Sequence, residues 1–318
     1  MGLGTSHMSA GSGGALTVDI PLLWGQKIND YFRFNLTLAD FFIDRSEELT
    51  DGGSDVYTPN IVALSTASKS YATQVTLNNP IQTKVTLTVS TWRESSFVIE
   101  DREMAQLKKS YYLQEKLAKS AAWEIAQDLE DAIAALFSGI GTNTLGLSSA
   151  NVADSTLLAA IALLENQGTP VYNGETAWIF HPNTFYRQIG SVDKLTLWQN
   201  TSTELPRVKA PTRSLYSIPV IVSPSVPIPT SGTYNQARVN LLAHKDTFHW
   251  ARLSLPVKTD MGYVGDQGVR VQQSYVHEYL GELFTVDLCY GVVENRDNAA
   301  VLIASHSVAV GFSPSYVN

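Results

Sequence analysis

The residues most able to do chemistry lie in HKDTFH, where His244, Asp246 and His249 fall within six positions. Two imidazoles and a carboxylate are ligands that zinc and iron accept, so this segment could hold a metal ion. The two histidines are five positions apart, which is a poor spacing for one helix face and fits no common zinc motif. We therefore expect surface and packing roles here, with a metal-dependent enzyme as the alternative hypothesis.

Three other segments contain side chains typical of catalysis, but their contexts favour structural roles. His181 precedes Pro182 at a predicted strand-to-helix turn, where its side chain can help satisfy the helix start. His277 and Glu278 are adjacent in an alternating strand pattern, so they point to opposite faces. GLSSA at 146–150 lacks the last glycine of a nucleophile elbow. We expect no catalytic residue and no enzyme activity.

Binding of nucleotides or nucleic acid is also not indicated. GIGTNTLG at 139–146 lacks the third glycine of the dinucleotide fingerprint, and no Gly-Lys-Ser/Thr occurs in the chain. The formal net charge is −8 and no dense basic run occurs, which argues against a general nucleic-acid binder. The single cysteine, Cys289, cannot form an internal disulfide, which suits a reducing compartment. No cofactor and no metal are expected.

The composition is that of a folded protein with a real core. The chain has 318 residues, of which 44% are hydrophobic, enough for two domains or one elaborated one. The best candidate for a membrane segment, AAVLIAS at 299–305, is far shorter than the roughly 18 apolar residues of a span. We expect no membrane association.

The longest helical pattern predicts a helix over 101–138, about 55 Å long. Apolar residues recur at steps of three and four, the spacing that lines one helix face. This buried stripe is expected to include Leu107, Ile125, Leu129 and Ile133. No catalytic motif lies on the helix, so its length calls for another explanation.

A β-hairpin is predicted immediately before this helix. Residues 55–98 are rich in Thr, Val, Ser and Tyr, and KVTLTVST alternates apolar and polar residues. An isolated hairpin is marginal in water, and no partner for it is evident in the chain. Gly52 and Gly53 are hinge candidates at its base, with an ordinary tight turn after Asp51 as the alternative. Residues 15–50, within an N-terminal arm of 1–54, are predicted to be extended, although FNLTLADFFIDRSEEL could form one short helix near its end.

With this order of elements, the chain resembles the major capsid proteins of tailed bacteriophages, whose Hong Kong-97 type fold is shared with encapsulins. The resemblance covers about 16–318 and rests on segments more than on one motif. The strand that enters the family's spine helix corresponds to TVSTWRESSFVIEDREM, and the end of that helix corresponds to SAAWEIAQDLEDAIAALFSGIG. A strand followed by a His-Pro helix start corresponds to WIFHPNTFYRQI. The family's proline-rich strand and loop correspond to YSIPVIVSPSVP, and its late His-Lys-Asp segment corresponds to LAHKDTFHWA.

The resemblance implies an α+β fold and a division of the chain. The long helix would be the spine of a peripheral domain, which explains its length, because this domain requires reach. The implied parts are an N-terminal arm (1–54), an extended loop (55–98), a peripheral domain (99–150 and 268–318) and an axial domain (151–267).

The resemblance also implies a function: a coat protein whose copies form the pentamers and hexamers of an icosahedral shell around double-stranded DNA. The protein would be part of the virion, assembled in the host cytoplasm. An acidic chain suits a wall that encloses DNA without binding it specifically. About 55 residues precede the hairpin, so a separate scaffolding protein is expected, and also a portal. The alternative within the fold is an encapsulin, but residues 1–35 show little of the amphipathic pattern of a cargo-binding helix.

In this family the hairpin is the extended loop, which lies across a neighbouring subunit. The residues expected at this subunit interface are Ser68, Lys69, Tyr71, Gln74 and Lys84. Some relatives crosslink a loop lysine to an asparagine of a neighbour. No local motif beside Lys69 or Lys84 identifies an acceptor or a catalytic glutamate, so crosslinking is not expected.

Overall fold

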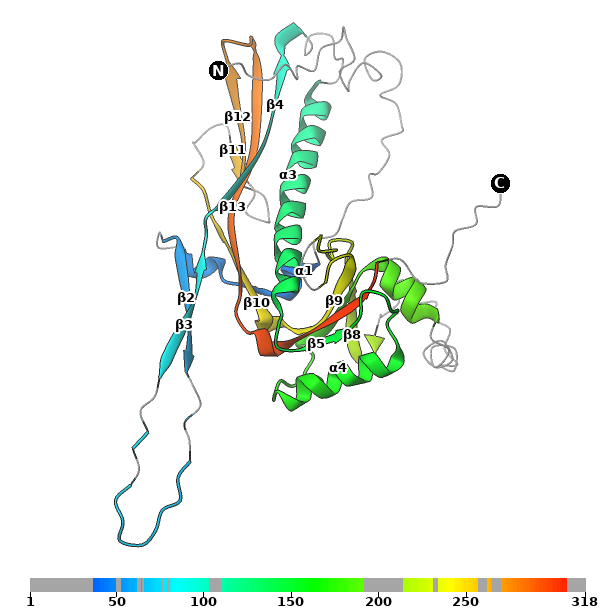
Figure 1. The fold of residues 1–318 in the computed structure, drawn as a ribbon. Coiled ribbons are helices and arrows are strands. Elements are labelled where there is room, and N and C mark those ends of the chain that lie inside the picture. Colours follow the sequence, from blue (N-terminus) through cyan, green and yellow to red (C-terminus); the bar gives the residue numbers. More distant parts are fainter. Residues whose placement is uncertain are drawn as a thin grey trace.

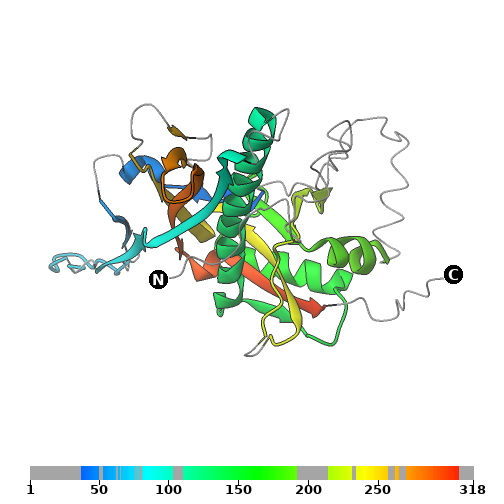
Figure 2. The same cartoon turned by 90° about the horizontal axis from the view of Figure 1, so that it is seen from above.

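The computed structural model has a body built around one long helix and a narrow hairpin that projects away from it (Figure 1, Figure 2). The structure describes residues 37–49, 53–61, 64, 66–75, 77–78, 81–102, 110–191, 214–230, 234–256, 262–264 and 270–307. Within these ranges, no helix has both the length and the apolar character needed to cross a membrane.

The long helix α3 runs over Ser110–Ala135 and continues as the 3-10 turn η2, Leu136–Gly139. Its 26 residues correspond to about 39 Å. Of the predicted range 101–138, residues 103–109 lie outside the described residues, and so does the stripe residue Leu107.

A mixed six-stranded sheet lies beside α3 (Figure 1). Its strand order is β1 (Ile43–Asp44), β10 (Phe248–Leu253), β13 (Gly281–Glu294), β12 (Arg270–Val276) and β11 (Gly262–Val264), and β4 (Thr91–Glu100) also pairs with β13. Strand β13 has 14 residues, which is enough for β10 and β12 to share one edge while β4 covers the other. This strand therefore holds the sheet together.

The interface between α3 and β13 is the centre of the main core. Ile125, Leu129 and Ile133 are 4%, 2% and 1% exposed, and they share one cluster with the buried Val286 and Leu288. The period of the helix and the period of the strand both place apolar side chains here. Burial of each such side chain contributes about 1.5–3 kcal/mol relative to exposure.

Polar contacts fix the orientation of the helix on the sheet. Asp128 of α3 accepts a hydrogen bond from the Tyr290 hydroxyl at 3.1 Å, and its Oδ2 lies 2.8 Å from Nε of Arg93. Tyr290 belongs to β13 and Arg93 to β4, so one carboxylate ties the helix to two neighbouring strands.

A second six-stranded sheet forms the other layer of the body (Figure 1). Its strand order is β5 (Thr144–Gly146), β14 (Ala300–His306), β9 (Ala237–His244), β6 (Thr176–Phe180), β8 (Ile218–Val222) and β7 (Ser214–Leu215). Helix α4 (Asp154–Asn166) packs on it through Leu157 and Leu164, which share a buried cluster with Trp178. The shorter helical elements are α1 (Leu38–Phe41), η1 (Ser46–Leu49), η3 (Thr184–Gln188), η4 (Ile189–Ser191), η5 (Lys245–Thr247) and η6 (Asp297–Ala299).

The predicted hairpin is shorter than expected. Strands β2 (Asp55–Ile61) and β3 (Gln82–Thr88) pair antiparallel, from Asp55 opposite Thr88 to Ile61 opposite Gln82. Residues 91–98, which the prediction placed in the hairpin, belong to β4 and pair with β13. The alternating pattern runs through both strands, so it indicates strand but cannot identify the partner.

The two sheets do not follow the domain ranges expected from the sequence. Strand β10 falls in the range expected for the axial domain, 151–267, but pairs with β13. Strand β14 falls in the range 268–318 but pairs with β9. The chain crosses between the sheets through the three-residue turns η5 and η6, which are too short to appear as linkers in the sequence.

The arm residues 37–49 are folded onto the body, in contrast to the extended arm predicted for 15–50. Strand β1 pairs parallel with β10, and Leu38 and Phe42 are 0% and 3% exposed in the main core. The Trp250 indole N–H donates to the Ala39 carbonyl at 2.9 Å. The apolar residues of LADFF therefore have a packing partner that their irregular spacing did not indicate.

The buried stripe of α3 gives a stability prediction. Ile125→Asp places an unpaired charge in the main core, so we expect it to lower the free energy of unfolding by several kcal/mol and prevent folding. Ser120→Asp introduces the same charge at an exposed position of the same helix and should change stability by less than about 0.5 kcal/mol. Urea unfolding of the soluble fraction measures both. Equal stability of the two variants would contradict the assignment of the buried face.

Candidate functional site: the polar turn and the loop surface

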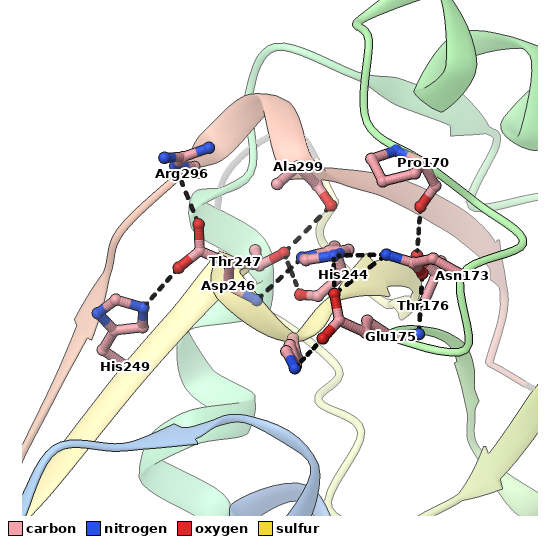
Figure 3. Close-up of polar contacts among 11 residues, drawn as sticks. Pro170, Asn173, Glu175, Thr176, His244, Asp246, Thr247, His249, Arg296 and Ala299 are labelled. Carbon is pink, nitrogen blue, oxygen red and sulfur yellow. Dashed lines mark hydrogen bonds and ion pairs between the residues drawn. The ribbon is translucent and has the colours of Figure 1, made fainter. Parts of the chain in front are cut away.

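The strongest candidate for chemistry, the segment 244–249, forms the connection between the two sheets (Figure 3). His244 ends β9, and its Nδ1 accepts a hydrogen bond from the Asp246 backbone N–H at 3.2 Å. Its Nε2 lies 3.4 Å from a carboxylate oxygen of Glu175. His249 lies on β10, and its Nε2 is 2.9 Å from Oδ1 of Asp246.

Asp246 joins two of the places where the chain crosses between the sheets, the short turns η5 and η6. Its Oδ2 lies 3.0 Å from Nε of Arg296, and Nδ2 of Asn295 donates to Oδ1 at 3.2 Å. Asn295 and Arg296 lead into η6, the second crossing, whereas Asp246 is in η5, the first. One carboxylate therefore clamps both connections, which is a structural role.

The geometry does not favour a metal ion at this turn. The two imidazole rings lie on different sides of η5: His244 accepts from the Asp246 backbone N–H, whereas His249 contacts the Asp246 carboxylate (Figure 3). His249 is 2% exposed, and burial lowers its pKa although the hydrogen bond to Asp246 acts in the opposite direction. Among the described residues, no group of three or more His, Cys, Asp or Glu could hold a metal ion.

His181 has the role that its context predicted. Its Nδ1 accepts a hydrogen bond from the Asn183 backbone N–H at 3.0 Å, at the start of the helical turn. Burial, with a smaller contribution from the positive charge of Arg238, lowers the pKa of His181 to about 4. The ring is therefore neutral at physiological pH, as an acceptor must be.

The loop between β2 and β3 carries four of the five interface candidates, Lys84 lies on β3, and each of the five is exposed. Lys69 donates to the Ser70 carbonyl at 3.1 Å, while the Lys84 ammonium lies 3.9 Å from the centre of the Tyr57 ring. Ser68, Tyr71 and Gln74 lie near the tip with Lys69, and Lys84 lies on β3. The candidates thus form an extended surface and do not converge on one point.

Apart from Tyr71, the apolar residues on the same loop were missed by the sequence prediction. Large hydrophobic side chains here are largely exposed, at 61% for Leu64, 101% for Tyr71, 62% for Val75, 85% for Leu77 and 63% for Ile81. Several exposed large apolar residues on one projecting loop favour an interaction surface. The available signal was the recurrence of single apolar residues in an otherwise polar loop.

The charge of the loop also differs from that of the whole chain. From Val56 to Trp92 the sequence has two lysines and no acidic residue, whereas the net charge of the chain is −8. A cationic, apolar loop is complementary in charge to an acidic surface such as another copy of the chain presents.

The base of the loop is firmly attached to the body. Val56, Leu87 and Val89 are buried against the β10 residue Ala251. A Cβ atom at Gly291 would lie 2.3 Å from the Thr88 carbonyl oxygen, so the close approach of β13 to the loop base requires glycine. The base therefore has an internal partner, contrary to expectation, and the distal part does not pack in this cluster.

The two hinge candidates differ in what the structure says of them. Gly52 lies outside the described residues. Gly53 does not have a left-handed φ, and a Cβ atom there would meet nothing within 4 Å. An alanine at Gly53 therefore fits the subunit, while the turn expected after Asp51 lies outside the described residues.

The chain is similar in sequence and in structure to known capsid proteins. Residues 82–279 match the model of a family described as phage capsid protein. No curated protein matches. Among solved structures, Mycobacterium phage Che8 has a TM-score of 0.66 at 17% identity over 90% of this chain and 97% of that one. The Cyanophage P-SCSP1u capsid has a TM-score of 0.67 at 13% identity, covering 92% and 94%.

The asymmetric unit of the bacteriophage PhiM1 mature capsid matches over 98% of both chains, with a TM-score of 0.64 at 11% identity. At identities this low, the structural similarity establishes the fold alone. The α+β capsid fold predicted from the sequence is confirmed. The family model matches more than half of the 318 residues. The chain belongs to the phage capsid protein family.

Proposed function

We propose that this coat protein builds a closed icosahedral shell from pentamers and hexamers of itself, and that its loop residues 64–81 bind across a neighbouring copy. The observation that carries the proposal is the contrast within the hairpin. Its base is buried against the chain's own sheet, while Leu64, Tyr71 and Leu77 expose most of their surface to solvent. A second copy is the partner that a shell places within reach of every loop.

The strength of such a contact comes from repetition. Burial of one large apolar side chain contributes about 1.5–3 kcal/mol, and ordering of the loop offsets part of this gain. In a closed shell each copy both gives and receives a loop, so the contacts act together at high effective concentration. Weak individual contacts are then sufficient, and they permit correction of errors during assembly.

Charge supports the same partner. The loop surface carries Lys69 and Lys84 without an acidic residue, and the chain as a whole is acidic. Attraction between such surfaces is screened by salt, so assembly through the loop should be slower at high ionic strength.

The roles of the two sheets follow from this arrangement. We assign the sheet containing β4 and β13, with α3, to the peripheral domain, and the sheet containing β6 and β9 to the axial domain. A capsid from a GTA particle with the same fold, TM-score 0.61 at 13% identity, was determined with C5 symmetry, which is consistent with five copies around an axis. Residues 1–54 would form the arm, part of which packs on the body.

The remaining partners follow from a shell that encloses DNA. The acidic wall encloses double-stranded DNA without specific binding. A separate scaffolding protein and a portal would take part, and assembly would take place in the host cytoplasm. An encapsulin remains the alternative shell, but the family model is described as phage capsid protein, and the P-SCSP1u and PhiM1 structures are phage capsids.

Removal of the distal loop tests the proposal. We expect a variant with residues 64–79 replaced by a short Gly-Ser turn to fold with unchanged free energy of unfolding, because the buried base residues Val56 and Leu87 are retained. The same variant should form no closed particles in sedimentation and negative-stain microscopy. The unaltered full-length chain, purified and treated in the same way, is the control, and it should assemble. Normal particles from the loop-deleted chain would contradict the proposal.

The glycine hinge gives a second test. We expect a Gly52→Ala, Gly53→Ala variant to give subunits as stable as wild type but small, irregular or open particles, because the angle of the loop must vary between positions in a shell. Gly291→Ala is the contrasting control, since its Cβ would meet the Thr88 carbonyl and should destabilise the subunit itself. Particle diameters from micrographs and thermal unfolding measure the two effects. Shells of normal size from the double variant would contradict the hypothesis that these glycines form a hinge.

A further inference from the structure

Glu130 is a buried acid on α3 that binds a segment distant in the sequence. The residue is 0% exposed. Its Oε1 accepts hydrogen bonds from the backbone N–H groups of Leu38 at 2.8 Å and Ala39 at 2.9 Å. These are the first two N–H groups of α1, which its own N-cap residue, Thr37, does not cap with its side chain. Glu130 therefore supplies the cap that the local sequence lacks.

The second oxygen of this carboxyl group has no partner among the residues that the structure describes. Oε2 of Glu130 is buried, and none of these residues forms a hydrogen bond with it. An ionised carboxylate needs several donors to replace its lost hydration, so the anion is disfavoured in this position. A single proton on the group removes the charge while Oε1 keeps both backbone hydrogen bonds.

The neighbouring charges act in the same direction. Burial is the main cause that raises the pKa of Glu130 to about 7; the two backbone hydrogen bonds oppose it, and the negative charges of Asp40 and Asp131 add to it. Asp40 lies on the arm segment and Asp131 on α3, and both are exposed. From β10 the side chains that contact the segment include Trp250 and Phe248, and both are uncharged.

The arm segment 37–42 is held by few other polar contacts. Its apolar residues Leu38, Ala39 and Phe42 lie in the main core, and the Trp250 indole N–H binds the Ala39 carbonyl. The bonds to Glu130 fix the start of the segment, so a change at this group acts where the arm joins the body.

We propose that Glu130 is a proton-controlled clip, which holds arm segment 37–42 on the spine helix when it is protonated and weakens that hold when it is ionised. The proposal concerns the arm and is independent of the loop contact. It gives a coat protein a means to couple the position of its arm to pH, a conformational control separate from the contacts between subunits.

The direction of the pH effect follows from linkage. When the segment is released, Glu130 meets water and its pKa returns toward an ordinary value, so release and loss of the proton favour each other. The docked segment is then favoured in acid. Its stability falls as the pH rises from the pKa of Glu130 in the released state through the pKa of Glu130 in the docked state. Above the docked-state pKa, no further change is expected from this group.

Hydrogen exchange of the full-length protein tests the clip. We expect the protection factor of amides in 37–42, corrected for intrinsic rates, to fall more than tenfold between pH 5 and pH 8. Amides of β14 should show no such change. Glu130→Gln should remove the pH dependence of 37–42, because glutamine keeps an acceptor oxygen and does not titrate. Equal protection of the wild type at both pH values, or unchanged pH dependence in Glu130→Gln, would overturn the proposal.

A second variant covers the case in which Glu130→Gln does not fold. Asp40→Asn with Asp131→Asn removes two exposed negative charges that favour protonation of Glu130. The pH at which 37–42 loses protection should move to lower values in this variant. An unchanged or higher transition pH would show that the group responsible is not Glu130.

Discussion

The packing of β13 on α3 is the constraint on which the rest of the structure depends. The buried side chains of β13 meet the stripe of α3, and its two edges pair with β10, β12 and β4. The arm segment rests on the same core through Leu38 and Phe42, and the base of the loop rests on the opposite side of the sheet. A rigid body of this kind is what a projecting loop requires, because a loop can bind a neighbour in a defined place only if its base does not move.

Polar contacts also hold the helix, the strands and the connecting turns of the body in fixed positions. Asp128 fixes the helix against two strands, and Asp246 joins the two short turns η5 and η6 that connect the sheets. Among the described residues, no group of three or more His, Cys, Asp or Glu that could hold a metal ion includes either carboxylate. Both carboxylates are partly exposed, and their contacts stabilise the arrangement of the helix and the sheets.

Much of the fold was predictable because its signals are local. Ile125, Leu129 and Ile133 repeat at helical spacing, and this alone predicts the buried face of α3. The end of the hairpin was not predictable, because the strand that pairs with Trp92 contains Cys289 and lies far along the chain. Glu130 was missed for a related reason: its partners are backbone N–H groups, which every residue except proline has, so no sequence pattern identifies them. The position of Glu130 between Leu129 and Ile133 was the available signal.

The central claim is that the exposed half of the loop is an intermolecular surface of a shell protein. Electron cryomicroscopy of particles assembled from the purified full-length chain tests it most directly, because both the shell and the position of each loop are seen in one map. The account predicts closed particles in which Tyr71 and Leu77 are buried against a neighbouring copy. A chain that stays monomeric, or a shell in which these two side chains pack on their own subunit or remain in solvent, would contradict it.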